Sequence, residues 1–176
     1  MNLSQEAIII IAAVFGGSFL LMIPIFIFQK KRKNKVKDYF AKNKDKALVQ
    51  IFGHSPIIDG EKAKNIEHQK GTNLEYIVPL SAGTHTIAAT YAASEPSLGR
   101  NVNYKTPEIT SEIEFEAGKN YTISLYFYSP EERHAYYKGD VGKAVYSQKL
   151  DSKNRYLGAN ANAYIICYEE DEKHCV

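Results

Sequence analysis

The hydrophobic and polar positions divide the chain into one long apolar run and a series of short alternating segments. Residues 7–28 read AIIIIAAVFGGSFLLMIPIFIF and contain no charged side chain. As an α-helix, about 22 residues rise about 33 Å, which matches a bilayer core of about 30 Å. The pattern predicts one transmembrane helix over residues 7–28, preceded by a short tail over residues 1–6.

A basic cluster follows the apolar run, and no Lys or Arg precedes it. The cluster consists of Lys30, Lys31, Arg32, Lys33, Lys35 and Lys37. A cleaved signal peptide has the basic residues first and a shorter apolar core, so we expect an uncleaved anchor. Because Lys and Arg beside a span stay in the cytoplasm, the N-terminus is predicted outside and the main domain in the cytoplasm. The cluster is expected to contact anionic lipid headgroups, at about 1 kcal/mol per residue.

A polar connector is expected at residues 29–46, and its part at residues 38–46 is either irregular or a helical continuation of the span. Beyond it, short apolar–polar alternations separated by turn signals indicate β-strands. The expected strands cover residues 47–53, 74–80, 84–92, 109–116, 120–129, 141–150 and 163–168. No βαβ alternation and no long amphipathic helix interrupts them. The pattern predicts an all-β fold, an antiparallel β-sandwich of about six to seven strands over residues 47–168, with an acidic tail at residues 169–176.

Two hairpins are expected between consecutive strands. The clearer one joins residues 109–116 to 120–129 through Ala117-Gly118-Lys119, because both strands alternate without a break. The other joins residues 74–80 to 84–92. Two connections are predicted as non-strand: a long loop at residues 93–108, which has no periodicity and two prolines, and a polar excursion with a helical turn at residues 130–140.

Composition and charge narrow the function classes. The part after residue 37 is the size of one ordinary domain. The formal charge of the chain is +2, but residues 1–37 hold six basic residues and one acidic residue, so the remainder is mildly acidic. This balance does not indicate nucleic-acid binding. Cys167 and Cys175 do not make a disulfide scaffold; they are expected as thiols in the cytoplasm, or as a closed C-terminal loop under the opposite orientation.

No common catalytic motif is present. The sequence lacks Gly-x-Ser-x-Gly, a phosphate-binding loop, HExxH and GxGxxG. We therefore expect a protein without enzyme activity and without a cofactor. His85 follows a predicted turn and is expected to lie on a polar face or to hydrogen-bond to the turn. A metal site from Cys167, His174 and Cys175 would lack CxxC spacing and a fourth ligand.

Tyrosine is the unusual component of the chain, with 13 residues and no tryptophan. Tyr126 and Tyr128 fall on the strand face opposite the predicted core, and Tyr104, Tyr136 and Tyr137 fall in predicted loops. Exposed aromatic side chains are common in protein and glycan contact surfaces, so these five tyrosines are candidate contact residues. The alternative for Tyr126 and Tyr128 is cross-strand packing on a covered second face.

Three turn regions resemble those of PEGA-like and related small β-sandwich domains. Residues 78–87 (VPLSAGTHTI) are similar to a "strand, small-Gly-x-His, strand" hairpin, and residues 115–121 (FEAGKNY) to an Ala-Gly-Lys-x-Tyr hairpin. Ile58-Asp59-Gly60 stands where such domains carry an Asp-Gly turn. The resemblance covers residues 47–128. It implies a structural or interaction module of a kind common in bacterial membrane and lipoprotein-type proteins, with no catalytic residues.

Together these observations favour a non-catalytic single-pass membrane protein. Its β-sandwich would be a scaffold or protein-interaction module at the cytoplasmic surface, in contact with the lipid bilayer and an unidentified protein. Residues 93–108 and 130–140 are candidate contact elements. The main alternative is an extracytoplasmic domain that binds a glycan or a peptide, and the third hypothesis is an enzyme without a recognisable motif.

Overall fold

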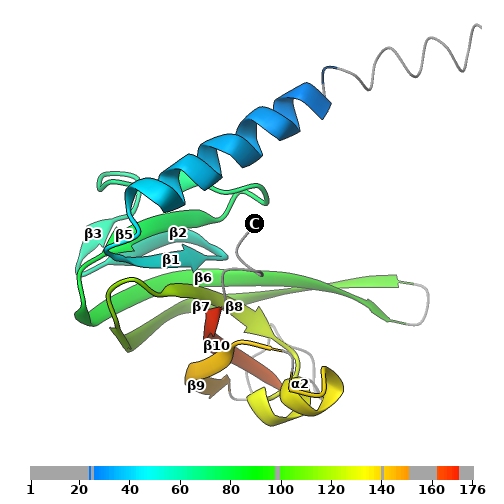
Figure 1. Cartoon of the computed structure of the whole chain (residues 1–176). Coiled ribbons are helices and arrows are strands. Elements are labelled where there is room, and N and C mark those ends of the chain that lie inside the picture. The colour runs from blue at the N-terminus through cyan, green and yellow to red at the C-terminus, as the bar shows by residue number, and fades with distance from the viewer. Residues whose placement is uncertain (1–23, 25, 98–99, 140, 151–161, 171–176) are drawn as a thin grey trace, which may run out of the picture.

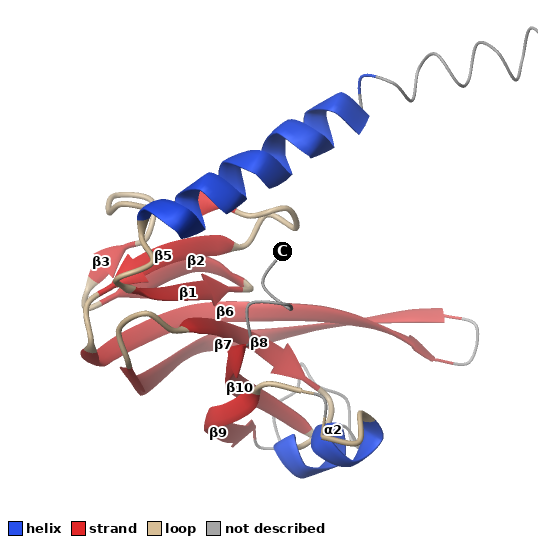
Figure 2. Cartoon of the chain, viewed as in Figure 1, coloured by secondary structure: helices blue, strands red, loops and turns tan. Residues whose placement is uncertain are grey.

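The alternating segments form two β-sheets that pack face to face around one hydrophobic core (Figures 1 and 2). The structure, a computed structural model, describes residues 24, 26–97, 100–139, 141–150 and 162–170 of the 176-residue chain. One sheet has six strands in the order β4-β5-β1-β8-β10-β9, and the other has four in the order β3-β2-β6-β7. The predicted all-β fold is confirmed.

Ten strands and a short helix, α2, follow an N-terminal helix at residues 26–42 in the described part of the chain. They are β1 (Ala47–Ile51), β2 (Gly53–Ile58), β3 (Glu61–Lys62), β4 (Gln69–Lys70), β5 (Tyr76–Leu80), β6 (Gly83–Ser97), β7 (Arg100–Phe115), β8 (Asn120–Tyr126), α2 (Pro130–Tyr136), β9 (Lys143–Leu150) and β10 (Ala163–Glu170). The expected six to seven strands are too few, because residues 47–58 form two strands and residues 61–70 add two short ones. The antiparallel prediction is wrong for one pair, since β1 and β8 run parallel.

Both predicted hairpins are wrong, although their strands exist. β7 lies at the edge of the four-stranded sheet, whereas β8 pairs with β1 and β10 in the other sheet. The alternation identified the buried faces correctly, because Ile113 and Tyr121 face the same core from opposite sheets. The chain therefore crosses the core after β7. The Tyr121 hydroxyl accepts a hydrogen bond of 3.0 Å from the Glu116 N–H across this turn, an arrangement similar to a tyrosine corner.

The second false hairpin has the same cause. β5 pairs with β4 and β1, while β6 pairs with β2 and β7. The turn between β5 and β6 thus transfers the chain from one sheet to the other. Gly83 begins the new strand with φ of +128°, a conformation that favours glycine over residues with a side chain.

The sequence pattern predicted a loop at residues 93–108, but residues 93–97 and 100–108, the described part of this segment, form the outer part of a long β-ribbon. β6 and β7 pair from Gly83↔Phe115 to Ser97↔Arg100, and their outer part extends beyond the other strands (Figure 1). A register shift near Tyr91 leaves Thr106 and Pro107 opposite one residue, and such a bulge accommodates a proline within a strand. Because the outer ribbon has no facing sheet, it also lacks the apolar alternation that marks a strand.

The N-terminal helix packs against the outer face of the six-stranded sheet (Figure 1). Val36 is 4% exposed and forms a small apolar cluster with Leu48 and Ile77, flanked by Tyr39 and Phe40. The connector expected at residues 29–46 is thus helical through residue 42 and belongs to the folded domain. The predicted span at residues 7–28 lies outside the described residues except for residues 24 and 26–28. No helix in the described part is long and apolar enough to cross a membrane.

Candidate functional site

Strand pairing gathers several loops at one end of the six-stranded sheet. β1 ends at Ile51, which lies opposite Tyr76 at the start of β5 and beside Ile123 in the middle of β8, and β8 continues towards this end as far as Tyr126. The loop at residues 71–75 and the segment at residues 127–137 therefore lie at this end, and the N-terminal helix begins on the same side (Figure 1). We call it the proximal end, and the opposite end, with the turn between β5 and β6, the distal end.

A groove of about 570 Å³ lies on the outer face of this sheet, between the N-terminal helix and α2. Its floor is polar and includes Gln50, Thr122 and Ser124; its walls come from Val36, the loop at residues 72–75 and α2. Apolar residues of the same face lie under the two helices instead. The outer face of the sheet thus has two areas covered by helices and a polar strip between them. This strip can bind a ligand with hydrogen-bonding groups.

The short helix α2 is specified by its own sequence. Ser129 is the N-cap, and its hydroxyl accepts a hydrogen bond of 3.2 Å from the Glu132 N–H. The Glu132 carboxylate in turn accepts a bond of 2.7 Å from the Ser129 N–H, and Pro130 occupies the first helical turn. This capping box with proline is a helix-start signal that can be read from the sequence. It sets the start of the predicted helical turn at Pro130.

Arg133 holds α2 against the sheet. Its guanidinium carbon lies 4.0 Å from the ring centroid of Tyr168 and 5.3 Å from that of Tyr126. Its Nη2 atom is 4.0 Å from a carboxylate oxygen of Glu170, while Nε and Nη1 are buried without a hydrogen-bond partner among the described residues. Since a desolvated cation–π contact is worth about 2 kcal/mol, the tyrosines supply much of the anchoring of α2.

Four of the five candidate tyrosines gather around this arginine. The rings of Tyr126 and Tyr128 are 5.4 Å apart, and those of Tyr136 and Tyr137 are 4.9 Å apart. Tyr128, Tyr136 and Tyr137 line a second hollow of about 480 Å³ next to the groove. Tyr136 and Tyr137 are 79% and 49% exposed, at the end of α2 and not in a loop as expected.

Two of the five candidate tyrosines, Tyr126 of this group and Tyr104, pack within the domain. Tyr126 lies on the face opposite the core, as predicted, but it is partly covered rather than fully exposed, because α2 lies over it. Burial raises the pKa of its hydroxyl, although the charge of Arg133 opposes this effect. Tyr104 lies on β7 and not in a loop, and its ring is 4.6 Å from that of Phe127. Contact with Phe127 therefore accounts for Tyr104. The ring of Tyr126 lies 5.5 Å from that of Tyr168 on the neighbouring strand, which is the cross-strand packing expected as the alternative for Tyr126, and Tyr126 forms the inner layer of the candidate surface.

The predicted lipid-contact residues lie along the N-terminal helix. Five of the six are exposed to solvent, and the sixth, Arg32, is half-buried. Phe26, Ile27 and Phe28 precede them and are 63%, 52% and 68% exposed. The helix thus changes from apolar to basic and then to a packed apolar stripe at Val36, which is the order expected for a helix that leaves a membrane and enters a domain.

A hydrogen-bonded cluster at the distal end was only partly predicted. His85 Nδ1 lies 2.6 Å from Asp59 Oδ2, and His85 Nε2 lies 3.1 Å from the main-chain oxygen and 3.3 Å from the hydroxyl of Ser81. These residue types match a nucleophile triad. However, the carbonyl of Ser81 competes for the Nε2 atom that a general base must keep available. The cluster instead ties the Asp59-Gly60 turn to the crossing between the sheets, in line with the turn contact expected for His85.

Because of this cluster, the unfolding free energy is expected to depend on pH in the acid range. Burial alone would raise the pKa of Asp59, but hydrogen bonds from His85 and the Thr86 N–H outweigh it and hold the pKa below the ordinary 3.8. A carboxylate with a lowered pKa stabilises the fold above its unfolded pKa and loses this effect as the pH falls through the folded value. We expect the unfolding free energy to decrease below about pH 4, by at most about 1 kcal/mol because Asp59 is half exposed.

Urea unfolding of the full chain in detergent, at neutral and at acid pH, measures this effect. In Asp59→Asn the corresponding part of the pH dependence should disappear. Glu61→Gln changes a nearby exposed carboxylate on β3 and is the matched control. A pH dependence that is the same in Asp59→Asn and in the unmodified chain would contradict the assignment.

The cysteines offer no accessible thiol in the described part. Cys167 is fully buried in the core as a free thiol, and burial raises its pKa. Cys175 and His174 lie outside the described residues, and with them the alternatives of a disulfide or a metal site. The described residues contain no group of three or more His, Cys, Asp or Glu side chains placed to hold a metal ion.

Comparisons with protein-family models, with curated proteins and with solved structures found no match. The resemblance to PEGA-like domains therefore stays a prediction. Its residues lie at three distal turns, around Asp59-Gly60, Gly83 and Gly118, each with a positive φ at glycine. Function must be inferred from the geometry of the proximal end and of the N-terminal helix.

Proposed function

We propose that the chain is a non-catalytic single-pass membrane protein whose β-sandwich is a protein-interaction module at the membrane surface. Residues 7–28 are the bilayer span. The observation that carries the proposal is the helix at residues 26–42, which runs without a break from the end of the apolar run to the sheet, where Val36 is buried. A helix that is packed at one end and anchored at the other gives the domain a fixed orientation to the membrane.

The exposed lysines support the same arrangement. They follow the apolar residues Phe26, Ile27 and Phe28 at the level where lipid headgroups would begin, and anionic headgroups attract such a cluster. Because the basic residues follow the span, the proposed orientation places the sandwich in the cytoplasm. The alternative, a glycan- or peptide-binding domain outside the cell, requires the opposite orientation.

The groove and the tyrosines beside it form the proposed contact surface. Tyrosine and arginine are enriched among the residues that dominate the binding energy of protein interfaces, and both Arg133 and Tyr137 line the groove. Its polar floor can form hydrogen bonds to an extended segment of a partner. Since one wall is the N-terminal helix itself, a partner in this groove would lie next to the membrane.

The orientation can be tested with single cysteines. Lys62→Cys, on an exposed distal strand, is combined with Cys175→Ser, and the buried Cys167 remains protected. We expect a membrane-impermeant maleimide to label residue 62 only after permeabilisation. Ser4→Cys, on the other side of the proposed span, is the matched control and should be labelled in intact cells. Labelling of residue 62 in intact cells would overturn the cytoplasmic assignment and favour the extracytoplasmic ligand-binding alternative.

A further inference from the structure

The carboxylate of Glu75 is buried without a cation to pair with it. Glu75 is 6% exposed, although a glutamate is almost never buried to this extent unless it is paired. Its Oε2 atom accepts a hydrogen bond of 2.8 Å from the Asn73 N–H. Its Oε1 atom has no hydrogen-bond partner, and no cationic side chain of the described residues lies within ion-pair distance of Glu75. The stability of the domain therefore gives no reason for a charge at this position.

The loop at residues 71–75 is folded around this carboxylate. The Gly71 N–H donates to the Glu75 carbonyl at 3.0 Å, and the Leu74 N–H donates to the Gly71 carbonyl at 3.2 Å. A Cβ atom at Gly71 would overlap with the Glu75 carboxylate, so only glycine leaves room for it. Leu74 has a φ of +69°, which is rare for a bulky side chain, and strained residues of this kind cluster at ligand-binding loops. The loop thus holds Glu75 in one position at a conformational cost.

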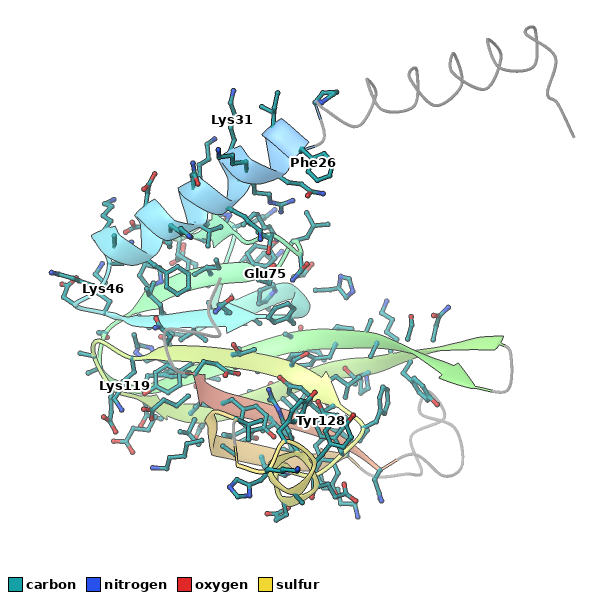
Figure 3. All side chains as sticks on the ribbon, turned by 45° about the vertical axis from the view of Figure 1, so that its right-hand side comes forward. Phe26, Lys31, Lys46, Glu75, Lys119 and Tyr128 are labelled. Atoms are coloured by element: carbon teal, nitrogen blue, oxygen red, sulfur yellow. The ribbon has the colours of Figure 1, made fainter. Side chains whose placement is uncertain are left out.

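Glu75 lies where the groove meets a second hollow. It lines the groove between the N-terminal helix and α2, and it also lines an adjoining hollow of about 520 Å³ on the side of Lys70. In Figure 3, Glu75 lies between the N-terminal helix and Tyr128, on the opposite side of the molecule from Lys119. The Oε1 atom is not fully enclosed. A ligand in the groove can therefore reach it.

The arginine and the lysine that line these two hollows have other partners. In the groove, Arg133 faces the carboxylate of Glu170. In the adjoining hollow, the ammonium of Lys70 lies 2.8 Å from the ring centroid of Tyr76. Among the described residues, Glu75 thus leaves one negative charge of the groove uncompensated. A ligand that supplies a cation there would be electrostatically complementary to it.

We propose that Glu75 binds the cationic side chain of a lysine or arginine in an extended segment of the partner protein. This inference rests on the proposed contact surface, because it names the chemistry that the same groove would recognise. Gln50 and Thr122 lie side by side on β1 and β8, and with Ser124 they offer hydrogen bonds to the backbone of such a segment. A segment without a cation would leave Glu75 buried and unpaired, so the carboxylate selects partners by charge.

A basic side chain fits this position better than a metal ion does. Ca²⁺ and Mg²⁺ require several oxygen ligands, and the described residues contain no group of three or more His, Cys, Asp or Glu side chains placed to hold a metal ion. An ammonium or guanidinium group can instead donate one hydrogen bond to Glu75 Oε1 and keep its remaining donors for water and for the polar floor of the groove.

Glu75→Gln separates a binding role from a structural one, because it keeps the shape of the side chain and removes its charge. We expect the urea midpoint for unfolding of the full chain in detergent to stay the same or to increase, since an unpaired buried charge is lost. Glu61→Gln, which changes an exposed carboxylate on β3, is the matched control and should leave the midpoint unchanged. A clear decrease in the midpoint of Glu75→Gln alone would show that the charge is structural and would overturn the inference.

The recognised charge can be identified with a displayed library of random linear peptides, selected on the full chain in phosphatidylcholine nanodiscs after removal of peptides that bind empty nanodiscs. Ser124→Trp fills the floor of the groove, and Tyr137→Ala changes its rim without altering the sheet. Peptides that lose binding to these variants bind in the groove. We expect them to share a Lys or Arg at one position, to bind Glu75→Gln at least about tenfold more weakly, and to bind Glu61→Gln equally well.

Two other results would overturn the inference, and they differ in what they leave standing. If the groove-binding peptides share no basic residue, or bind Glu75→Gln as tightly as the unmodified chain, the groove is a contact surface in which Glu75 has no role. If no selected peptide depends on Ser124 or Tyr137, the groove is not a contact surface, and the proposed function fails together with this inference.

Discussion

Val36→Asp is expected to detach the N-terminal helix from the sheet and to lower the unfolding free energy by about 2–4 kcal/mol. Val36 is 4% exposed, and Leu48 and Ile77 beneath it are 2% and 0% exposed. A carboxylate among these side chains would lose its hydration without gaining a partner in the cluster. The helix can avoid that cost only by moving away, which exposes Leu48 and Ile77 to water.

Hydrogen exchange of the amides in residues 30–42, together with urea unfolding, measures both effects. Lys35→Asp is the matched control, because it places the same side chain one position earlier on the exposed side of the helix. It should change the unfolding free energy by no more than about 0.5 kcal/mol and leave exchange nearly unchanged. Equal behaviour of the two variants would show that the helix is a free tether and not part of the domain.

Strand positions could be read from the sequence because each strand buries one face. Ile113, Phe115, Tyr121 and Ile123 alternate with polar residues, and all four are buried. The same pattern does not determine which strands are neighbours. A strand can bury its apolar face either in a hairpin within one sheet or opposite a strand of the other sheet across the core. β7 and β8 do the second. The parallel partner of β8 is β1, which lies far earlier in the chain and leaves no local signal.

The hydrophobic pattern did not predict the outer ribbon or the packing of the N-terminal helix, and both failures have a physical reason. Burial in the described part of residues 93–108 is irregular: Thr106 is buried and Tyr104 packs against Phe127, but the ribbon then extends beyond the other strands (Figure 1). Pro107 is accommodated in a bulge that has no signal in the sequence. In the helix, Val36, Tyr39 and Phe40 have the spacing of one helical face, but lysines surround them. That stripe was present in the sequence and could have predicted the docking of the connector.

The candidate site, too, could be predicted from the sequence only in part. Tyr128, Tyr136 and Tyr137 could be selected from composition and pattern, and the structure brings them together. The role of Arg133 could not be selected, because the sequence Glu-Glu-Arg-His is typical of a solvated loop. Its burial depends on Tyr126 and Tyr168 from two neighbouring strands, and on a capping box that turns α2 towards them. Tertiary contacts of this kind have no signature within a single segment.

Placing two arginines in the apolar run is expected to release the protein from the membrane. In Val14→Arg/Leu20→Arg, each arginine near the centre of a span costs about 2.5–3.5 kcal/mol of insertion free energy, so the pair would remove most of the anchoring. Gln29→Arg/Asn34→Arg adds the same two charges to the basic cluster, where headgroups accept them. This control should behave as the unmodified chain does.

The measurement that tests the central claim most directly is alkaline carbonate extraction of membranes that contain these three proteins. If the chain is a β-sandwich held at the bilayer by residues 7–28, the unmodified protein and Gln29→Arg/Asn34→Arg stay in the membrane pellet, and Val14→Arg/Leu20→Arg moves to the supernatant. Extraction of the unmodified protein, or retention of Val14→Arg/Leu20→Arg as firm as that of the control, would contradict the account.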